Sequence, residues 1–255
     1  MRRNLIIICI TIFTAIITFG QTSAPQAQKS RYVPTGEEGI ITGTIYFKGK
    51  VPETFQIDMS QDYVCAQINP KARLGNVVVT KGRLANAVVY VESGDALNTY
   101  SFEAPSSAAS LYHKGCQYVP HVLGIQTYQP LLIINSDPTI HNTHSLPRLE
   151  GGNEERNVSQ PPGTAPIKMV FAHQELFIKF KDNQHPWEKA YVWVFSHPFF
   201  AVSDKDGSYK IEGLPPGDYT IRIGHEERLD EQTVKVTISP HETKTLDFTF
   251  KTQDR

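Results

Sequence analysis

The sequence predicts an all-β protein built of two consecutive β-sandwiches. Short apolar or alternating segments, such as residues 41–47 and 87–91, recur along the chain and are bounded by turn-forming residues. After residue 200 the segments become short and regular, and hydrophobic residues alternate with polar ones over residues 234–238 and 246–250. Strands at this spacing, separated by Gly/Pro turns, predict a small antiparallel sandwich at the C-terminal end.

The strand pattern also continues through the middle of the chain. Apolar segments lie at residues 131–134, 176–180 and 191–195. Two long polar stretches, residues 93–115 and 146–166, lack a convincing helical period. We therefore expect loops there, because segments of this length without periodicity are usually functional loops or disordered.

The N-terminal segment is expected to direct export. Two arginines precede an apolar run over residues 5–19, which is shorter than the roughly twenty residues that span a bilayer. Small residues follow, and the pattern predicts a signal peptide over residues 1–24 and a flexible tether over residues 25–38. We expect a periplasmic or secreted protein with no membrane span after cleavage; the alternative is an uncleaved membrane anchor.

Charge and motifs exclude some classes of function. The formal net charge is −1 at pH 7, and removal of the two arginines makes the remaining chain slightly more acidic. No basic run or basic-aromatic stripe occurs, so we expect no nucleic-acid partner. The chain also has no Gly-x-Ser-x-Gly element and no phosphate-binding loop, so we expect it not to be an enzyme.

Two cysteines, Cys65 and Cys116, follow the predicted signal. In an oxidising compartment such a pair most simply forms a disulfide. Closure of a loop of about fifty residues would stabilise the fold by roughly 4 kcal/mol in the chain-entropy treatment. The alternative interpretation takes Cys116 and His121 as metal ligands.

Two loops carry the outline of a metal site. His141 follows the apolar segment at residues 131–134, and Asp182, His185 and Glu188 lie between two further apolar segments. This arrangement resembles the cupredoxin family, and in particular the short amicyanin-like loop Cys-x-x-His-Pro-x-Met. The resemblance implies that His141 and His185 occupy the two histidine positions, Asp182 the cysteine position and Glu188 the methionine position.

The rest of the chain resembles two known groups of proteins. It is similar to exported proteins often labelled methylamine utilisation proteins through Gly-Cys-Gln-Tyr-Val-Pro-His-Val at 115–122, Asn-Ser-Asp-Pro at 135–138, His-Pro-Trp at 185–187 and His-Pro-Phe-Phe-Ala-Val at 197–202. It also resembles a carboxypeptidase regulatory-like, transthyretin-type domain through Asp-Gly-Ser-Tyr at 206–209 and Leu-Pro-Pro-Gly-Asp-Tyr at 214–219. The resemblance implies a cupredoxin-like Greek-key sandwich over residues 39–196 and a transthyretin/prealbumin-like β-sandwich over residues 197–255.

Replacement of both sulfur positions by carboxylates changes the chemistry that the site can support. A blue-copper site needs a thiolate, so we expect no blue-copper electron transfer. Imidazole with carboxylate suits Zn²⁺ or Cu²⁺, which predicts a metal site at His141, Asp182, His185 and Glu188. Secondary candidates are His121 and His144, whereas His113, His173 and His241 follow no pattern. The alternative is a decayed site that binds no metal.

Three functions are compatible with the sequence. The first is an exported, non-enzymatic protein that binds Cu(II) or zinc at a degenerate blue-copper site. The second is a metal-free adhesion or scaffold module that binds an envelope protein or a glycan through its loops. The third is a metal-dependent enzyme that uses the same four residues.

Overall fold

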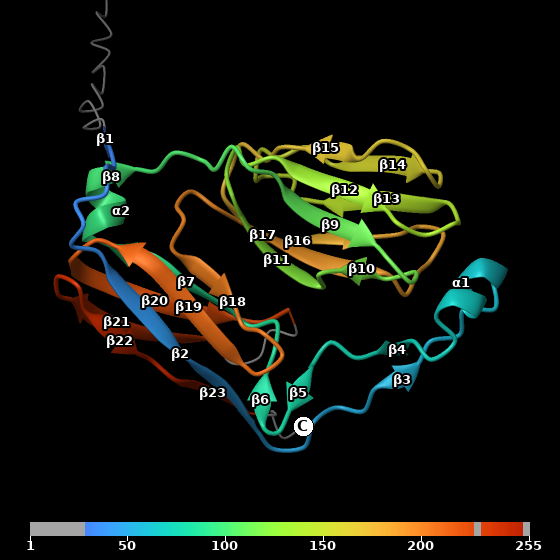
Figure 1. The fold of residues 1–255 in the computed structure, drawn as a ribbon, viewed down its shortest axis with the longest axis horizontal. Coiled ribbons are helices and arrows are strands. Elements are labelled where there is room, and N and C mark those ends of the chain that lie inside the picture. The colour runs from blue at the N-terminus through green and yellow to red at the C-terminus, as the bar shows by residue number, and fades with distance from the viewer. Residues whose placement is uncertain (1–28, 227–230, 252–255) are drawn as a thin grey trace, which may run out of the picture.

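The computed structural model describes residues 29–226 and 231–251, and it shows an all-β protein of two sandwiches (Figure 1). The predicted signal peptide, residues 1–24, and the start of the predicted tether lie outside the described residues. The end of the tether is not free, because strand β1 (Ser30–Arg31) pairs with β8 (Tyr100–Ser101). Within the described ranges no helix is long and apolar enough to cross a membrane.

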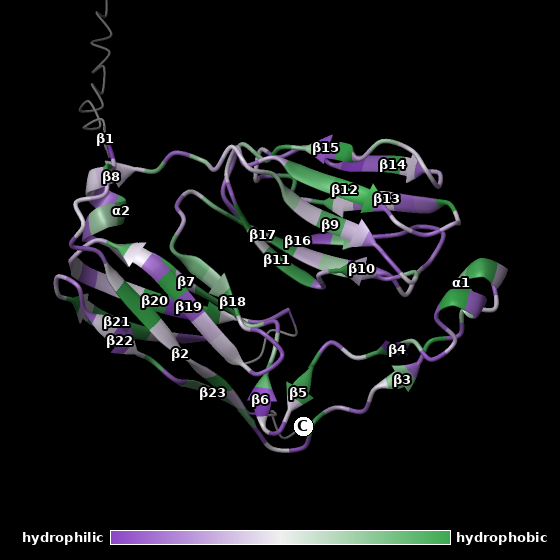
Figure 2. Ribbon diagram, viewed as in Figure 1, coloured by the Kyte–Doolittle hydropathy of each residue, from purple (hydrophilic) through white to green (hydrophobic). Residues whose placement is uncertain are grey.

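The first sandwich consists of two sheets that enclose one hydrophobic core. The four-stranded sheet has the order β10-β9-β12-β15, with β9 (Ala109–His113), β10 (Tyr118–Val119), β12 (Leu131–Asn135) and β15 (Ile167–Met169). The five-stranded sheet has the order β11-β17-β16-β13-β14, with β11 (Val122–Gln126), β13 (His141–Leu146), β14 (Arg156–Gln160), β16 (Glu175–Lys181) and β17 (Lys189–Phe195). Both sheets contribute to the core, which includes Leu111, Ile133 and Phe180. Figure 2 shows β14 as mainly hydrophilic, which fits its position at an open sheet edge.

The second sandwich is also made of two sheets. One has the order β18-β7-β20-β21, with β7 (Val88–Gly94), β18 (Phe200–Val202), β20 (Gly217–Gly224) and β21 (Gln232–Ile238). The other has the order β19-β2-β6-β5, with β2 (Gly39–Lys48), β5 (Val79–Thr80), β6 (Arg83–Leu84) and β19 (Ser208–Leu214); β22 (Thr243–Thr245) and β23 (Phe248–Lys251) also pair with β2. Its core includes Ile41 and Ile45 from β2, Val89 from β7 and Ile221 from β20.

The chain crosses between the sandwiches twice, which differs from the predicted division into residues 39–196 and 197–255. Strands β2 and β7 belong to the second sandwich, although they precede every strand of the first. β2 alternates buried and less buried residues along its length, and this alternation fits any two-layer sheet equally well. Sequence order alone could therefore not reveal that the first sandwich is inserted between two halves of the second.

The two sandwiches contact each other through a separate aromatic cluster. Tyr90 of β7 lies 6.0 Å from Trp193 and 5.2 Å from Phe195, both on β17, measured between ring centroids. Val88 and Val122 extend the same buried cluster. Burial of these large apolar side chains fixes one sandwich against the other.

An arm leaves the second sandwich after β2 and reaches the far end of the first (Figure 1). It contains β3 (Phe55–Gln56), helix α1 (Tyr63–Ile68) and β4 (Arg73–Leu74). The Asp62 side chain caps α1 by accepting a hydrogen bond from the Cys65 N–H. A disulfide joins Cys65 to Cys116, with 5.6 Å between their Cα atoms. Because the Cys116 sulfur is bonded, the alternative in which Cys116 and His121 are metal ligands does not describe this form of the protein.

The long polar stretches are more ordered than predicted. The first holds α2 (Asp95–Thr99) as well as β8 and β9, and the second holds β14. Their pairing is supplied by neighbours distant in sequence: β9 lies beside β12, and β14 beside β13. Partners of this kind leave no local pattern in the sequence.

Candidate metal centre

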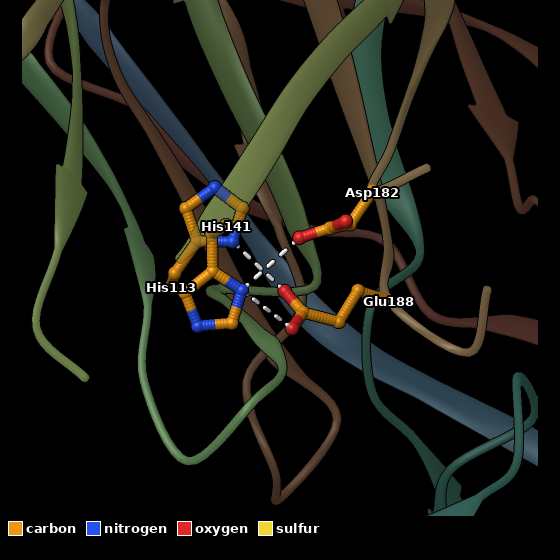
Figure 3. A group of neighbouring side chains, drawn as sticks. All are labelled: His113, His141, Asp182 and Glu188. Carbon is orange, nitrogen blue, oxygen red and sulfur yellow. Dashed lines mark hydrogen bonds and ion pairs between the residues drawn. The ribbon is translucent and has the colours of Figure 1, made fainter. Parts of the chain in front are cut away.

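Four buried side chains converge at one end of the first sandwich (Figure 3). His113 ends β9 and His141 begins β13, while Asp182 and Glu188 flank the loop between β16 and β17. One potential ligand atom from each residue lies within 4.8 Å of every other. None of the four is more than 2% exposed to solvent.

Short distances link the nitrogens and oxygens of this cluster. Nδ1 of His141 is 3.0 Å from Oδ2 of Asp182 and 3.0 Å from Oε1 of Glu188. Nδ1 of His113 is 2.8 Å from Oε2 of Glu188. The His113 and His141 rings stack at 4.4 Å with an 11° angle between their planes. Two imidazoles and two carboxylates therefore face one small volume.

His113 reaches the cluster through strand pairing. β12 pairs in parallel with β9, and the register sets Asn135 against His113. The hydroxyl Oγ1 of Thr143 lies 3.0 Å from His113 Nε2 and holds the ring with Nδ1 facing Glu188. No recognised motif surrounds His113, and only the parallel pairing of two distant segments indicates its position.

The Asp182 carboxylate also organises the loop that carries it. Oδ1 accepts the backbone N–H groups of Gln184 at 2.6 Å and His185 at 3.0 Å. Oδ2 accepts the N–H of Asn142 at 2.9 Å and faces His141. One carboxylate thus ties the loop to β13 and presents an oxygen to the cluster.

His185 lies beside the four-residue cluster rather than inside it. Its Nδ1 is 3.1 Å from Oδ2 of Asp182 and 3.5 Å from Oε1 of Glu188. Its Nε2 points the other way, 3.1 Å from Oδ2 of Asp62 on the arm. The structure therefore brings together the four predicted ligands His141, Asp182, His185 and Glu188, and it adds His113 to the core of the set.

The two secondary candidates lie outside the cluster. His121 bonds through Nδ1 to the Lys189 carbonyl at 3.0 Å and through Nε2 to Glu226 at 2.9 Å. The ring nitrogens of His144 contact Asn183 and Glu155. Since both nitrogens of each ring are engaged elsewhere, neither histidine contributes a ligand to the cluster as it stands.

Carboxylates dominate the electrostatics of the cluster. Burial disfavours a charged His141, but the carboxylates of Asp137, Asp182 and Glu188 outweigh burial and raise its pKa to about 11. Burial likewise opposes ionisation of Asp182, yet contacts with His141 and His185 hold the pKa of its carboxyl well below the ordinary range. Without a metal, the cluster therefore contains an imidazolium between carboxylates.

The donor set fits a metal ion. Oε1 of Glu188 is buried, and it makes ion-pair contacts with Nδ1 of His141 at 3.0 Å and Nδ1 of His185 at 3.5 Å. Two carboxylate oxygens also approach Nδ1 of His141, which can carry only one proton. Ligands held tetrahedrally at about 2.0–2.2 Å from a common ion lie roughly 3.3–3.6 Å apart. The close pairs, at 2.8–3.0 Å, would therefore move apart slightly to admit an ion, within a set whose atoms all lie within 4.8 Å of one another.

A carboxylate behind His141 would hold this ligand in position for such an ion. Nε2 of His141 lies 3.1 Å from Oδ2 of Asp137, so the ring is held between this carboxylate and the cluster. Carboxylate–histidine–metal arrangements of this kind orient the ring and raise its basicity. Asp137 stands in the Asn-Ser-Asp-Pro motif, but the sequence did not indicate this role.

Comparison with known proteins gives a partial family match and similar folds. The carboxypeptidase regulatory-like domain family matches residues 178–251, a span that begins within β16 and leaves out β2 and β7. Among curated protein sequences, none matches this chain.

Several solved structures are similar. The purple cupredoxin from Nitrosopumilus maritimus is 21% identical, covering 34% of this chain and 98% of that chain, with a TM-score of 0.28. Amicyanin from Paracoccus versutus is 17% identical, covering 42% and 96%, with a TM-score of 0.31. The Cu-containing nitrite reductase from Thermus scotoductus is 15% identical, covering 41% of this chain and 27% of that chain, with a TM-score of 0.32.

The class of protein is thus an all-β protein with cupredoxin-like structural neighbours and a carboxypeptidase regulatory-like domain. At these identities and TM-scores the neighbours define neither its ligand nor its activity. The case for a metal depends on the geometry of this chain's own residues.

Proposed function

We propose that this protein is a non-blue metal-binding protein that holds Zn²⁺ or Cu²⁺ at His113, His141, Asp182 and Glu188. The observation that carries the proposal is the convergence of two buried imidazoles and two buried carboxylates, whose potential ligand atoms all lie within 4.8 Å of one another. Buried carboxylates that converge on one small volume are costly unless a cation lies between them.

The ligand atoms restrict the kind of ion and its use. The four-residue cluster offers two imidazole nitrogens and carboxylate oxygens but no sulfur. Such donors suit Zn²⁺ or Cu²⁺, and they lack the thiolate that a blue-copper centre needs. The degenerate site therefore supports metal holding rather than blue-copper electron transfer.

A closed coordination shell supports a non-enzymatic role. The cluster offers four protein ligands, and each is almost completely buried. Catalytic zinc sites typically have three protein ligands and keep one position open for water or substrate. A site filled by the protein itself is better suited to storage, transfer or structural stabilisation.

The cell envelope is the proposed location. The apolar N-terminal run matches a secretory signal, and the Cys65–Cys116 disulfide suits an oxidising compartment. The resemblance to exported proteins labelled methylamine utilisation proteins supports the same location.

Metal titration of the oxidised protein tests the proposal. The chain is stripped with a chelator, and binding of Zn²⁺ and Cu²⁺ is measured by calorimetry and by metal analysis after gel filtration. We expect one ion per chain, with at least tenfold weaker binding for Glu188→Gln and for His113→Ala. His173→Ala is the matched control, because this exposed histidine lies outside the cluster. Equal binding by all four proteins would refute the assignment.

A metal-free scaffold is the second candidate function, and one observation favours it. Although burial lowers it, the pKa of His141 is raised to about 11 by its carboxylate neighbours, so the cluster holds a positive charge between its carboxylates without any ion. In that case the cluster is an internal ion network, and an envelope protein or a glycan would bind to the loops. Folded wild-type protein that takes up neither metal would support this function.

A further inference from the structure

The disulfide and two carboxylates form a layer on the outer side of the histidines. His185 Nε2 faces Asp62, and His141 Nε2 faces Asp137, at 3.1 Å in both cases. Each of these aspartates also accepts the backbone N–H of a cysteine: Cys65 bonds to Asp62 and Cys116 to Asp137. The two His–Asp–Cys units meet at the disulfide.

One of these units already has the spacing of a metal site. Asp62, Cys65 and His185 each place a potential ligand atom within 4.8 Å of the others. The Cys65 sulfur is 3.6 Å from His185 Nε2, and the disulfide places the Cys116 sulfur beside it. None of these four residues belongs to the inner cluster of His113, His141, Asp182 and Glu188.

The backbone around both cysteines is held independently of the S–S bond. Asp62 accepts the Cys65 N–H at 3.0 Å, and Asp137 accepts the Cys116 N–H at 2.8 Å. The Asn69 amide donates to the Gly115 carbonyl at 2.8 Å and so ties the arm to the Cys116 loop. These bonds would keep the two sulfurs neighbours after the disulfide is broken.

The surroundings of the two cysteines would also keep reduced thiols in place and shielded from solvent. Both cysteines are fully buried in a cluster that also contains Met59 and Ala72, with Trp187 packed against it. The Trp187 indole N–H donates to the Cys116 carbonyl at 3.0 Å. Thiols released here would lie beside an imidazole and a carboxylate, away from bulk solvent.

We propose that reduction of the Cys65–Cys116 disulfide creates a second metal site, formed by both thiolates, His185 Nε2 and Asp62, for Zn²⁺ or Cu⁺. A dithiol reductant supplies two electrons and two protons: the S–S bond breaks, the dithiol becomes a disulfide, and two cysteine thiols form. The incoming ion displaces the thiol protons and the proton on His185 Nε2. Thiolate ligands favour Cu⁺ and also bind Zn²⁺, whereas the sulfur-free inner cluster suits Zn²⁺ or Cu²⁺.

Cobalt provides the test, because thiolate-bound Co²⁺ has an intense near-ultraviolet charge-transfer band that nitrogen and oxygen ligands do not give. The full chain is titrated with Co²⁺ in the oxidised form and after reduction by a non-chelating phosphine. We expect the band, and one additional ion per chain, only after reduction. Cys65→Ser and Cys116→Ser should each lose at least half of the band intensity, the double variant should lose all of it, and His185→Ala should bind at least tenfold more weakly.

The two sites are distinguished by one further variant and one further measurement. His113→Ala removes a ligand of the inner cluster and contacts no ligand of the second site, so its reduced form should keep the thiolate band. Zinc binding by the oxidised wild type reports the inner cluster alone. Absence of the band in reduced wild type, its undiminished intensity in Cys116→Ser, or loss of the native circular dichroism on reduction would each overturn the second site without touching the first.

Discussion

Oε2 of Glu188 lies 2.8 Å from Nδ1 of His113, although the two residues are positioned by opposite sheets of the first sandwich. His113 ends β9 in the four-stranded sheet, whereas Glu188 immediately precedes β17 in the five-stranded sheet. An ion held by both residues would join the two sheets at this end of the sandwich. Metal binding should therefore be visible in the stability of the fold as well as in a binding isotherm.

Zinc should stabilise the oxidised protein against unfolding. A ligand that binds only the folded state at a free concentration of about 100 times its Kd adds about 2.7 kcal/mol. We expect a rise in the urea midpoint with Zn²⁺ that a chelator reverses. His113→Ala should lose this rise and His173→Ala should keep it; a zinc-independent midpoint in wild type would contradict the site.

Restoring the two sulfur ligands should produce a coloured copper protein. In Asp182→Cys/Glu188→Met, a thiolate would stand near His141 and His185, whose Nδ1 atoms lie 3.0 and 3.1 Å from the Asp182 carboxylate. A copper–thiolate bond of the blue-copper type absorbs strongly in the visible range. Addition of Cu²⁺ should give an intense band that single Glu188→Met lacks. A folded but colourless double variant would show that the loop no longer presents these positions to copper.

Stability should fall in mild acid because of His197. Its side chain is 3% exposed and accepts the Phe199 N–H at Nδ1, and burial lowers its pKa to about 4. The unfolded chain, with an ordinary pKa of about 6.5, therefore binds a proton more readily than the folded chain. The stabilisation is complete above pH 6.5 and is lost progressively as the pH falls towards 4, by roughly 3 kcal/mol in all.

The measurement is urea unfolding between pH 4 and pH 7. His197→Asn cannot titrate in this range, and its amide oxygen can take the place of Nδ1 as acceptor for Phe199. We expect a clearly shallower pH dependence in this variant. Identical pH profiles would mean that His197 does not set the acid limb of stability.

The C-terminal segment should not fold by itself. Residues 197–255 lack β2, which pairs with β19, β22 and β23, and β7, which lies between β18 and β20. Without these strands the core loses Ile41, Ile45 and Val89. We expect a disordered circular dichroism spectrum for this fragment and a folded one for residues 29–255. A cooperatively folded fragment would contradict the shared-sheet architecture.

Local sequence patterns predict the strands better than their partners. The alternating or apolar segments at residues 41–47, 131–134 and 191–195 all form strands, in β2, β12 and β17. Alternation specifies which side chains face a core but not which sheet the strand joins. The predicted boundary at residue 197 differs from the observed sheets for that reason.

The difference between local patterns and long-range pairing also explains which residues of the candidate site could be predicted from the sequence. One short loop carries Asp182, His185 and Glu188, and His141 follows a recognisable strand. The sequence alone therefore identifies these four residues as candidate ligands. His113 sits in a polar stretch, and its place depends on the register between β9 and β12. Asp62 depends on the arm that the disulfide attaches to the first sandwich. Contacts between segments distant in the sequence therefore place both His113 and Asp62, and no local motif predicts these contacts.

The insertion of one sandwich into the other also sets an order of events as the chain is made. About 100 residues separate the end of β7 at Gly94 from the start of β18 at Phe200. At roughly 10 residues per second, β7 waits on the order of 10 s for its partner β18. Every strand of the first sandwich emerges within that interval. The histidine cluster can therefore assemble, and meet an ion, before the sheets around β2 are complete.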